Sequence, residues 1–489
     1  MERLPSQASP NVDIFGGDSY WAYCIFFFLG LGNLFPWNSF ITASYYFSDR
    51  FCGSDFEDNF ENYFTLSFTI CQTVGLALTI LYCENWAIDT KVMYPLTLYS
   101  LVFLITTILV SIYVDATYFF EITIILTCIS GVCGSLLSAG IFGMAAYFPA
   151  EFTGALMNGQ GLAGLTVSLS SLLTSAAGPA IDICDDDANT EDDDGKCEFH
   201  VSYSAMVYFG IATLVLALNI VCYIYLKRLK ITKHYVDKFD AASDSSFSAL
   251  DKDKAKRGGG GSIKTQLRSN LLITDVDSGE VPISWDVGGI DISNIDKEQR
   301  RKSEIADTNG TVKEILNSIW VPALSVFLSF TVTIGVFPAL FVFVESEKQC
   351  HDDSSRFYND LYIPFLFLIF NLFDFIGRVS AEKFKPLLNS KTILPFAFLR
   401  FLFIPLFLLC NISNSELPVV MKSDFFPVFI DALFAVTNGY LASCAMMLGP
   451  TLVSPKDSGV AGTVMIFCLT LGLLGGGCLS FLVVFISQG

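Results

Sequence analysis

The hydrophobic residues of this chain occur in long runs that are separated by shorter polar stretches. A helix needs about 20 predominantly apolar residues to cross the hydrocarbon core of a bilayer, and about eleven runs reach that length. The predicted spans are 19–47, 61–83, 92–114, 118–147, 153–183, 201–226, 315–344, 358–381, 392–411, 424–452 and 458–486. Pro149 marks the turn that divides the long run 118–183 into two helices. The pattern predicts an all-α membrane protein.

The polar segments divide these spans into a six-plus-five arrangement. Residues 227–314 are rich in Ser, Asp, Lys and Gly and have too few apolar residues to form a core, so they predict a largely disordered cytosolic linker. We therefore expect a tail (1–18), a six-helix bundle (19–226), the linker (227–314) and a five-helix bundle (315–489). Two bundles of this kind suit a carrier whose halves rock against each other.

Charge sets the expected orientation. Most of the 29 Lys and Arg residues fall in the connections that face the cytosol when the N-terminus is cytosolic, as the positive-inside rule requires. An odd number of spans then places the C-terminus outside. The first apolar run continues into a full span, so we expect no cleavable signal peptide. No acidic dileucine sorting signal is visible, which leaves the plasma membrane as the expected location.

Composition narrows the function classes. Only 16% of residues are charged, against about 25% in soluble domains. The net charge of −19 comes largely from acidic loops, which we interpret as solvated surface, and no basic aromatic-rich surface predicts a nucleic-acid partner. The three histidines lie in or near loops and no nucleophile or metal constellation is visible, so we expect no enzyme activity, no cofactor and no metal. No obligate protein partner is inferred.

Four of the fourteen cysteines fall in segments expected outside: Cys52, Cys184, Cys197 and Cys350. Four cysteines allow three pairings. A bond between Cys184 and Cys197 would close one short acidic loop and is the first choice. In the linker, Ser303 follows Arg300-Arg301-Lys302 and resembles a basophilic kinase site, although an inert linker is the plainer interpretation.

Charged residues are costly inside a membrane, and two of them share one predicted span. Asp374 and Arg378 are four residues apart, so they lie on one helical face and can pair. Phe367 and Asn371 continue the same stripe. Such a ladder can hydrogen-bond a polar solute, although a structural ion pair between helices is the alternative. Arg400 lies near a membrane end, where snorkelling is the expected behaviour.

The first span carries a second group of candidate residues. Leu34, Trp37 and Ile41 lie at i, i+3 and i+7, beside Asn38. A Trp ring in mid-span offers a flat wall on which a planar base can stack, and ordinary helix packing is the alternative. Asn158 to Gly161 lie at the cytosolic start of a later span, where they either cap the helix or form part of a gate.

Several motifs together resemble the equilibrative nucleoside transporter family, solute carrier family 29. They are GLGNLFPWNSFITA at 30–43, NGQGLAG at 158–164, FNLFDFIGR at 370–378 and NGYLAS at 438–443. The resemblance covers nearly all spans. It implies a fold similar to the major facilitator carriers and equilibrative transport of nucleosides such as adenosine and uridine, with nucleobases as an open question.

The resemblance also implies site residues. Arg378 and Asp374 would meet the ribose hydroxyls. The base would be enclosed by Trp37, Leu34, Ile41 and Leu473, with Asn371 nearby. One departure stands out, because Ser138 occupies the position where mammalian members have a base-contacting glutamine. The shorter hydroxyl cannot span the same distance, so purine or pyrimidine preference does not transfer.

Two other functions remain open from the sequence. Asp374 is an intramembrane acid of the kind found in proton relays, so proton-coupled transport is one alternative. Its arginine neighbour favours the ionised form and argues against that coupling. A receptor or channel without carrier turnover is the alternative from another class, and the split arrangement of the spans argues against it.

Overall fold

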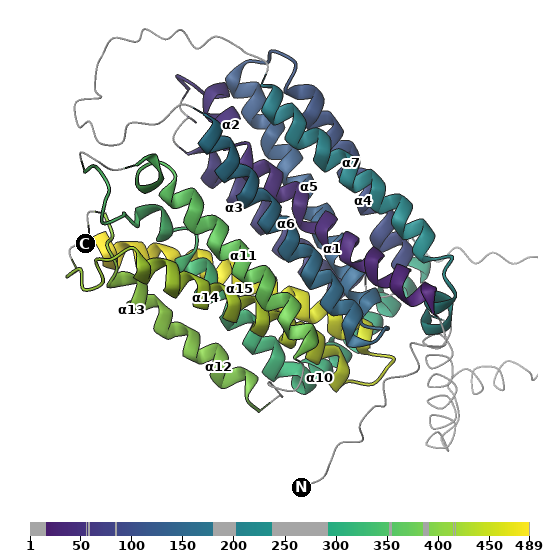
Figure 1. The fold of residues 1–489 in the computed structure, drawn as a ribbon. Coiled ribbons are helices and arrows are strands. Elements are labelled where there is room, and N and C mark those ends of the chain that lie inside the picture. The colour runs from purple at the N-terminus through teal and green to yellow at the C-terminus, as the bar shows by residue number, and fades with distance from the viewer. Residues whose placement is uncertain are drawn as a thin grey trace, which may run out of the picture.

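The computed structural model describes residues 16–488 except 55, 57–58, 84–85, 179–201, 237–291, 352–354, 385–390, 414 and 416. These residues are almost entirely helical, as the apolar pattern predicts (Figure 1). Cys184 and Cys197 lie outside the described residues. Cys52 and Cys350 are both disulfide-bonded. Ser303 lies in a helix whose side chains at that point are also outside the description.

The described residues before 227 form seven helices. They are α1 (Gly17–Thr42), α2 (Ser44–Arg50), α3 (Phe60–Tyr82), α4 (Ile88–Leu109), α5 (Ala116–Ala145), α6 (Ala150–Ala177) and α7 (Tyr203–Leu226). Pro149 is the N-cap of α6, at the predicted turn. The predicted first span, 19–47, is divided, because α1 ends at Thr42 and the short α2 follows it.

The second half begins with a long helix. The elements are α10 (Ile292–Val336), η2 (Phe341–Phe343), η3 (Arg356–Tyr358), α11 (Tyr362–Lys383), α12 (Ile393–Leu399), η5 (Arg400–Leu402), α13 (Phe403–Leu408), α14 (Phe425–Leu448), η6 (Gly449–Leu452) and α15 (Ser458–Gln488). Because α10 starts at Ile292, residues 292–314 of the predicted linker are helical. Most of the remaining linker lies outside the described residues.

Within the described residues, nine helices are long and apolar enough to cross a membrane. The two other predicted spans correspond to α6 and to the segment Ile393–Leu408. Helix α6 has the length but contains many small and polar residues, including Asn158 and Gln160. The segment Ile393–Leu408 is interrupted at η5, because Pro405 has no N–H to donate to the carbonyl of residue 401.

The helices of each half pack mainly on one another, and the halves meet along a few pairs of helices. In Figure 1 the first half, purple to teal, lies beside the green and yellow second half. Contacts between the halves run mainly from α6 to α11 and α14, and from α5 and α3 to α15. We call the end that holds the α5–α6 turn the Pro149 end, and the opposite end the Cys350 end.

Glycines allow the closest approaches between these helices. A Cβ placed on Gly161 would lie 2.7 Å from Arg378 Cδ, and one on Gly164 would lie 2.4 Å from Asn371 Oδ1. A Cβ on Gly439 would lie 2.0 Å from the carbonyl oxygen of Asp374. Larger residues would push α11 away from both α6 and α14, so these small residues set the position of the polar side chains on α11.

Candidate functional site

The carboxylate and guanidinium predicted to pair on one helix do so. On α11, Arg378 Nε donates to Asp374 Oδ2 at 2.6 Å, and each side chain is only 8% exposed. Asn438 of α14 donates from Nδ2 to the other carboxylate oxygen at 2.8 Å. Both oxygens of Asp374 are therefore hydrogen-bonded, which offsets much of the cost of burying the charge.

The network continues into the second half. Asn438 Oδ1 lies 2.7 Å from the hydroxyl of Thr333 on α10, and Arg400 Nη2 donates to the same hydroxyl at 2.9 Å. Arg400 is 1% exposed, so the expectation that it snorkels to the membrane end is wrong. Its Nη1 donates to the carbonyl of Phe434 at 2.8 Å, and its guanidinium lies 4.6 Å from the Phe434 ring centroid.

This arrangement places two guanidinium groups around one carboxylate. Asp374 contacts Arg378 directly and connects to Arg400 through Asn438 and Thr333. The cluster of buried side chains carries a net positive charge and spans α10, α11, η5 and α14. We call these five residues the charged network. Such a network holds its donors in fixed directions before a solute arrives.

The Arg378 guanidinium lies where the two halves meet. Its Nη1 donates to the carbonyl of Met157 on α6 at 3.3 Å, and its stem packs on Gly161. Its Nη2 has no hydrogen-bond partner among the described residues and is not sealed from solvent. One donor of a rigidly held guanidinium is thus available to a solute. Asn371, two turns before Arg378, instead donates to the carbonyl of Phe367 at 2.9 Å.

The predicted base-facing residues on α1 form an aromatic wall together with α3. Trp37 stacks on Phe68, with ring centroids 4.0 Å apart and an interplanar angle of 10°. One face of the indole is therefore covered, and a base has access only to its other face or its edge. Leu34 is half-buried, as is Leu473 on α15, which packs against the same core. Ile41 is 54% exposed and is the least enclosed of the predicted residues.

Ser138 of α5 lies beside α1. Its hydroxyl donates to Asn33 Oδ1 at 3.1 Å, and both residues are buried. The Ser138 hydroxyl is therefore already bonded to a neighbouring side chain. Asn33 lies within the motif at 30–43, but no sequence pattern distinguishes it from its neighbours.

A polar contact joins the halves at the Pro149 end. Glu382 of α11 accepts at Oε2 from the Tyr23 hydroxyl at 2.7 Å and from Asn158 Nδ2 at 2.9 Å. Of the two roles considered for Asn158, a helix cap or part of a gate, its contact with Glu382 suits the gate. Close packing of α5 on α15 adds to this closure, since a Cβ on Gly462 would lie 2.6 Å from the Phe142 carbonyl oxygen.

A different contact joins the halves at the Cys350 end. Arg356, in η3 before α11, donates to the carbonyl of Ser175 at 2.5 Å and to that of Gly178 at 2.9 Å. Asp360 holds the guanidinium, with 2.8 Å between its Oδ2 and Nη2. A cation at a helix C-terminus donates to carbonyls that lack intrahelical partners and interacts favourably with the negative end of the helix dipole. Neither this contact nor the role of Glu382 was predicted from the sequence.

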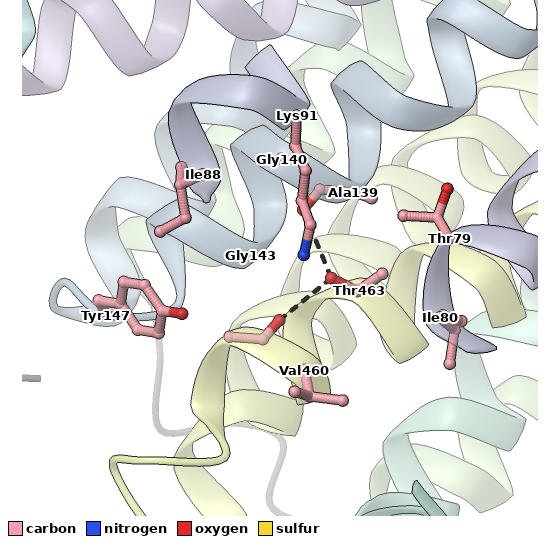
Figure 2. Close-up of a pocket in the computed structure, with 11 residues that line it drawn as sticks. Thr79, Ile80, Ile88, Lys91, Ala139, Gly140, Gly143, Tyr147, Val460 and Thr463 are labelled. Atoms are coloured by element: carbon pink, nitrogen blue, oxygen red, sulfur yellow. Dashed lines mark hydrogen bonds between the residues drawn. The ribbon is translucent and has the colours of Figure 1, made fainter. Parts of the chain in front are cut away.

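A small cavity lies between the halves near the Pro149 end, away from the charged network. Its volume is about 50 Å³, and α3, α4, α5 and α15 line it. Figure 2 shows the Lys91 amine directed toward Thr463, whose hydroxyl lies 3.2 Å from the carbonyl oxygen of Gly459. The cavity is too small to hold a nucleoside-sized solute. Among the described residues no group of three His, Cys, Asp or Glu is placed to hold a metal.

Comparisons with known proteins identify the family of the chain. The family model described as "Nucleoside transporter" matches residues 123–485. The chain belongs to the nucleoside transporter family. It is 34% identical to equilibrative nucleoside transporter 1 of Rattus norvegicus, with 94% of this chain and 96% of the relative aligned. It is 32% identical to equilibrative nucleoside transporter 2 of Homo sapiens, over 95% and 97%.

Solved structures confirm the fold class of this nucleoside transporter family member. The E. coli fucose:proton symporter superposes with a TM-score of 0.53 at 10% identity, covering 96% of this chain and 91% of that one. A proton:xylose symporter of the major facilitator superfamily gives 0.52 at 12% identity, covering 97% and 95%. The chain is thus a multi-pass integral membrane protein with a carrier fold, and its family is one of transporters rather than enzymes.

Proposed function

We propose that this member of the family carries nucleosides across the membrane down their concentration gradient. The observation that supports this most is the Arg378 guanidinium, which is held by Asp374 and the Met157 carbonyl between the halves and keeps one donor available. The cis-diol of a ribose presents two adjacent hydroxyls that suit a guanidinium paired with a carboxylate. Trp37 lies on the opposite half and offers its uncovered face to the base.

Alternating access would require the two end contacts to break in turn. The Glu382 contact closes the Pro149 end, and the Arg356 contact joins the halves at the Cys350 end. The polar part of each contact is a few hydrogen bonds to a charged group, each worth about 1.5–3 kcal/mol net. Solute bound by groups from both halves would favour rearrangement between the two states.

The same proposal includes the location and orientation of the protein. Positive residues favour a cytosolic N-terminus, which puts the Pro149 end in the cytosol and the C-terminus outside. Disulfide-bonded Cys52 and Cys350 then face the oxidising side of the membrane, as expected for the plasma membrane. The 227–314 linker would lie in the cytosol between the two bundles.

Proton coupling is the weaker alternative within the carrier class. A coupling acid must take up and release a proton during the cycle. Both oxygens of Asp374 accept hydrogen bonds, from Arg378 and Asn438, so both are already engaged within the charged network. We therefore expect the uptake rate to be the same at acidic and neutral external pH and to survive an uncoupler. A rate that rises steeply with acidification would favour coupling.

The test of the function is uptake of labelled adenosine and uridine by cells that lack their own nucleoside carriers. Saturable uptake, accelerated when the cells are preloaded with unlabelled nucleoside, would support a carrier, because a channel shows no such counterflow. Arg378→Ala should abolish uptake while the protein still reaches the cell surface. Wild-type uptake by that variant would contradict the proposed site, and no uptake by the native chain would contradict the proposed substrate class.

A further inference from the structure

Ser138 of α5 is too short to reach a base as a longer amide side chain would. The Ser138 hydroxyl is short, and its one proton is directed to Asn33 Oδ1 at 3.1 Å. That bond engages the amide oxygen of Asn33 and leaves its Nδ2 group for another partner. The Nδ2 group has no partner among the described residues, and it is not sealed from solvent although Asn33 is only 9% exposed.

A second amide lies close to the same part of α5. Gln72 is in the middle of α3, and a Cβ placed on Gly134 would lie 3.7 Å from Gln72 Nε2. Gly134 is one helical turn before Ser138, on the same face of α5. The ring of Phe68, one turn before Gln72, is also within 3.9 Å of that Cβ position. Phe68 is the residue that stacks on Trp37.

Gln72 faces the protein interior rather than lipid. The exposed apolar residues of α3 form one stripe: Leu66, Ile70, Val74 and Leu78. Gln72 is two residues from both Ile70 and Val74, which is about 200° of rotation and places it on the opposite side of the helix. Its amide is half-buried, has no hydrogen-bond partner in the part of the chain that the structure describes, and is not sealed from solvent.

The Nδ2 group of Asn33 and the amide of Gln72 lie on inward helix faces at mid-membrane and need water or a solute as a partner. An amide without a hydrogen bond in an apolar environment costs about 1–3 kcal/mol by mutational data. Inside a bilayer, polar groups of this kind are retained where they line a solvated cavity or a solute pathway. Their position beside Trp37 and Phe68 places them at the base end of the site, away from the ribose end at Arg378.

We propose that Asn33 and Gln72 together read the hydrogen-bonding edge of the base, and that Ser138 acts by fixing Asn33. This proposal rests on the proposed nucleoside transport and adds the residues that determine base preference. An amide offers both donors and an acceptor, so it can pair with the amino and carbonyl groups of neutral purines and pyrimidines. It discriminates against a base that lacks those groups because its own polar atoms are then left unpaired.

The test compares adenosine with purine riboside, which has the same ribose and ring system but lacks the exocyclic amino group. In the native chain the KM for purine riboside should exceed that for adenosine by about 3- to 10-fold, the value of one or two net hydrogen bonds. Gln72→Leu should bring that ratio closer to one, mainly by raising the KM for adenosine, because the Gln72 amide oxygen can accept from the exocyclic amino group. Asn33→Leu should instead raise both KM values by a similar factor, because Asn33 Nδ2 would donate to a ring nitrogen that both ribosides have. Gln72→Asn, which keeps the amide, should preserve part of the discrimination.

Val74→Leu is the matched control, because Val74 is on the lipid face of the same helix and the change is between apolar residues. It should leave both KM values unchanged. If the native chain transports adenosine, and neither the ratio in Gln72→Leu nor the two KM values in Asn33→Leu change at normal surface expression, the inference is wrong while the transport function stands. If the native chain transports no nucleoside, the proposed function fails instead.

Discussion

The two halves of the protein contribute chemically different surfaces to the candidate site. The second half supplies the charged network, whose members bond to one another across four elements. The first half supplies aromatic rings and uncharged amides, namely Trp37, Phe68, Asn33 and Gln72. The ribose is the same in every ribonucleoside and the base varies. A fixed, charged ribose end would suit the constant part of the solute, and an uncharged, less tightly bonded base end would suit the variable part.

The largest effect should come from breaking the charged network at its carboxylate. Asp374→Ala leaves Arg378 buried beside no anion, and removing one partner of a buried ion pair costs about 3–5 kcal/mol. We expect a lower melting temperature of the purified protein and loss of nucleoside uptake. Both are measured alongside surface expression. A variant with normal melting temperature and uptake would show that the ion pair is dispensable.

Removing the indole from the aromatic wall should affect both transport and stability. Trp37→Ala removes the surface on which the base stacks, worth about 1–3 kcal/mol per base in nucleic-acid binders. The KM for adenosine should rise by about 5- to 100-fold, and loss of the stack on Phe68 should also lower the melting temperature. Trp37→Phe is the control, since it keeps a ring against Phe68. Equal KM values for the alanine and phenylalanine variants would contradict a stacking role.

A second buried acid in the same half lacks the hydrogen-bond partners that Asp374 has. Asp431 of α14 is fully buried, and neither carboxylate oxygen has a hydrogen-bond partner among the described residues. Replacing an unsatisfied buried acid by an apolar residue of similar size removes its desolvation cost. Asp431→Leu should therefore raise stability by about 1 kcal/mol and leave uptake unchanged. A loss of uptake would give Asp431 a role in transport.

The smallest effect is expected at the least enclosed residue of the base end. Ile41 is 54% exposed, so Ile41→Val removes a methylene that is only partly withdrawn from its surroundings. The change should alter the KM for adenosine by less than about twofold, corresponding to well under 1 kcal/mol. An effect as large as that of Trp37→Ala would mean that Ile41 closes over the base in another conformation.

The sequence predicted the residues of one helix better than the contacts between helices. The spacing of Asp374 and Arg378 predicted their pairing, because residues four apart on a helix face the same way. Asn438 and Thr333 were not predicted as partners. The approach of Asn438 to Asp374 depends on Gly377 and Gly439, which allow α11 and α14 to pack closely. No local sequence pattern shows which helices will be neighbours.

Other features that the sequence did not predict also depend on contacts between elements or on local breaks in helices. Arg400 was expected to snorkel because it lies near the end of a predicted span, but the break at η5 directs it inward to Phe434 and Thr333. The stacking of Trp37 on Phe68 was invisible because the two rings come from separate helices. The helical start of α10 at Ile292 was missed, because its first residues are polar and carry no apolar pattern of a span.

The division between a ribose end and a base end is tested most directly by combining Arg378→Lys with changes in the solute. Uridine is compared with its 2′,3′-dideoxy form, which lacks both ribose hydroxyls, and adenosine with purine riboside. Lysine keeps the charge but loses the planar fork of donors. We predict that the variant loses most of the native preference for uridine over the dideoxy form and keeps the native preference for adenosine over purine riboside. Unchanged hydroxyl preference, or loss of both preferences together, would contradict the assignment of the charged network to the ribose.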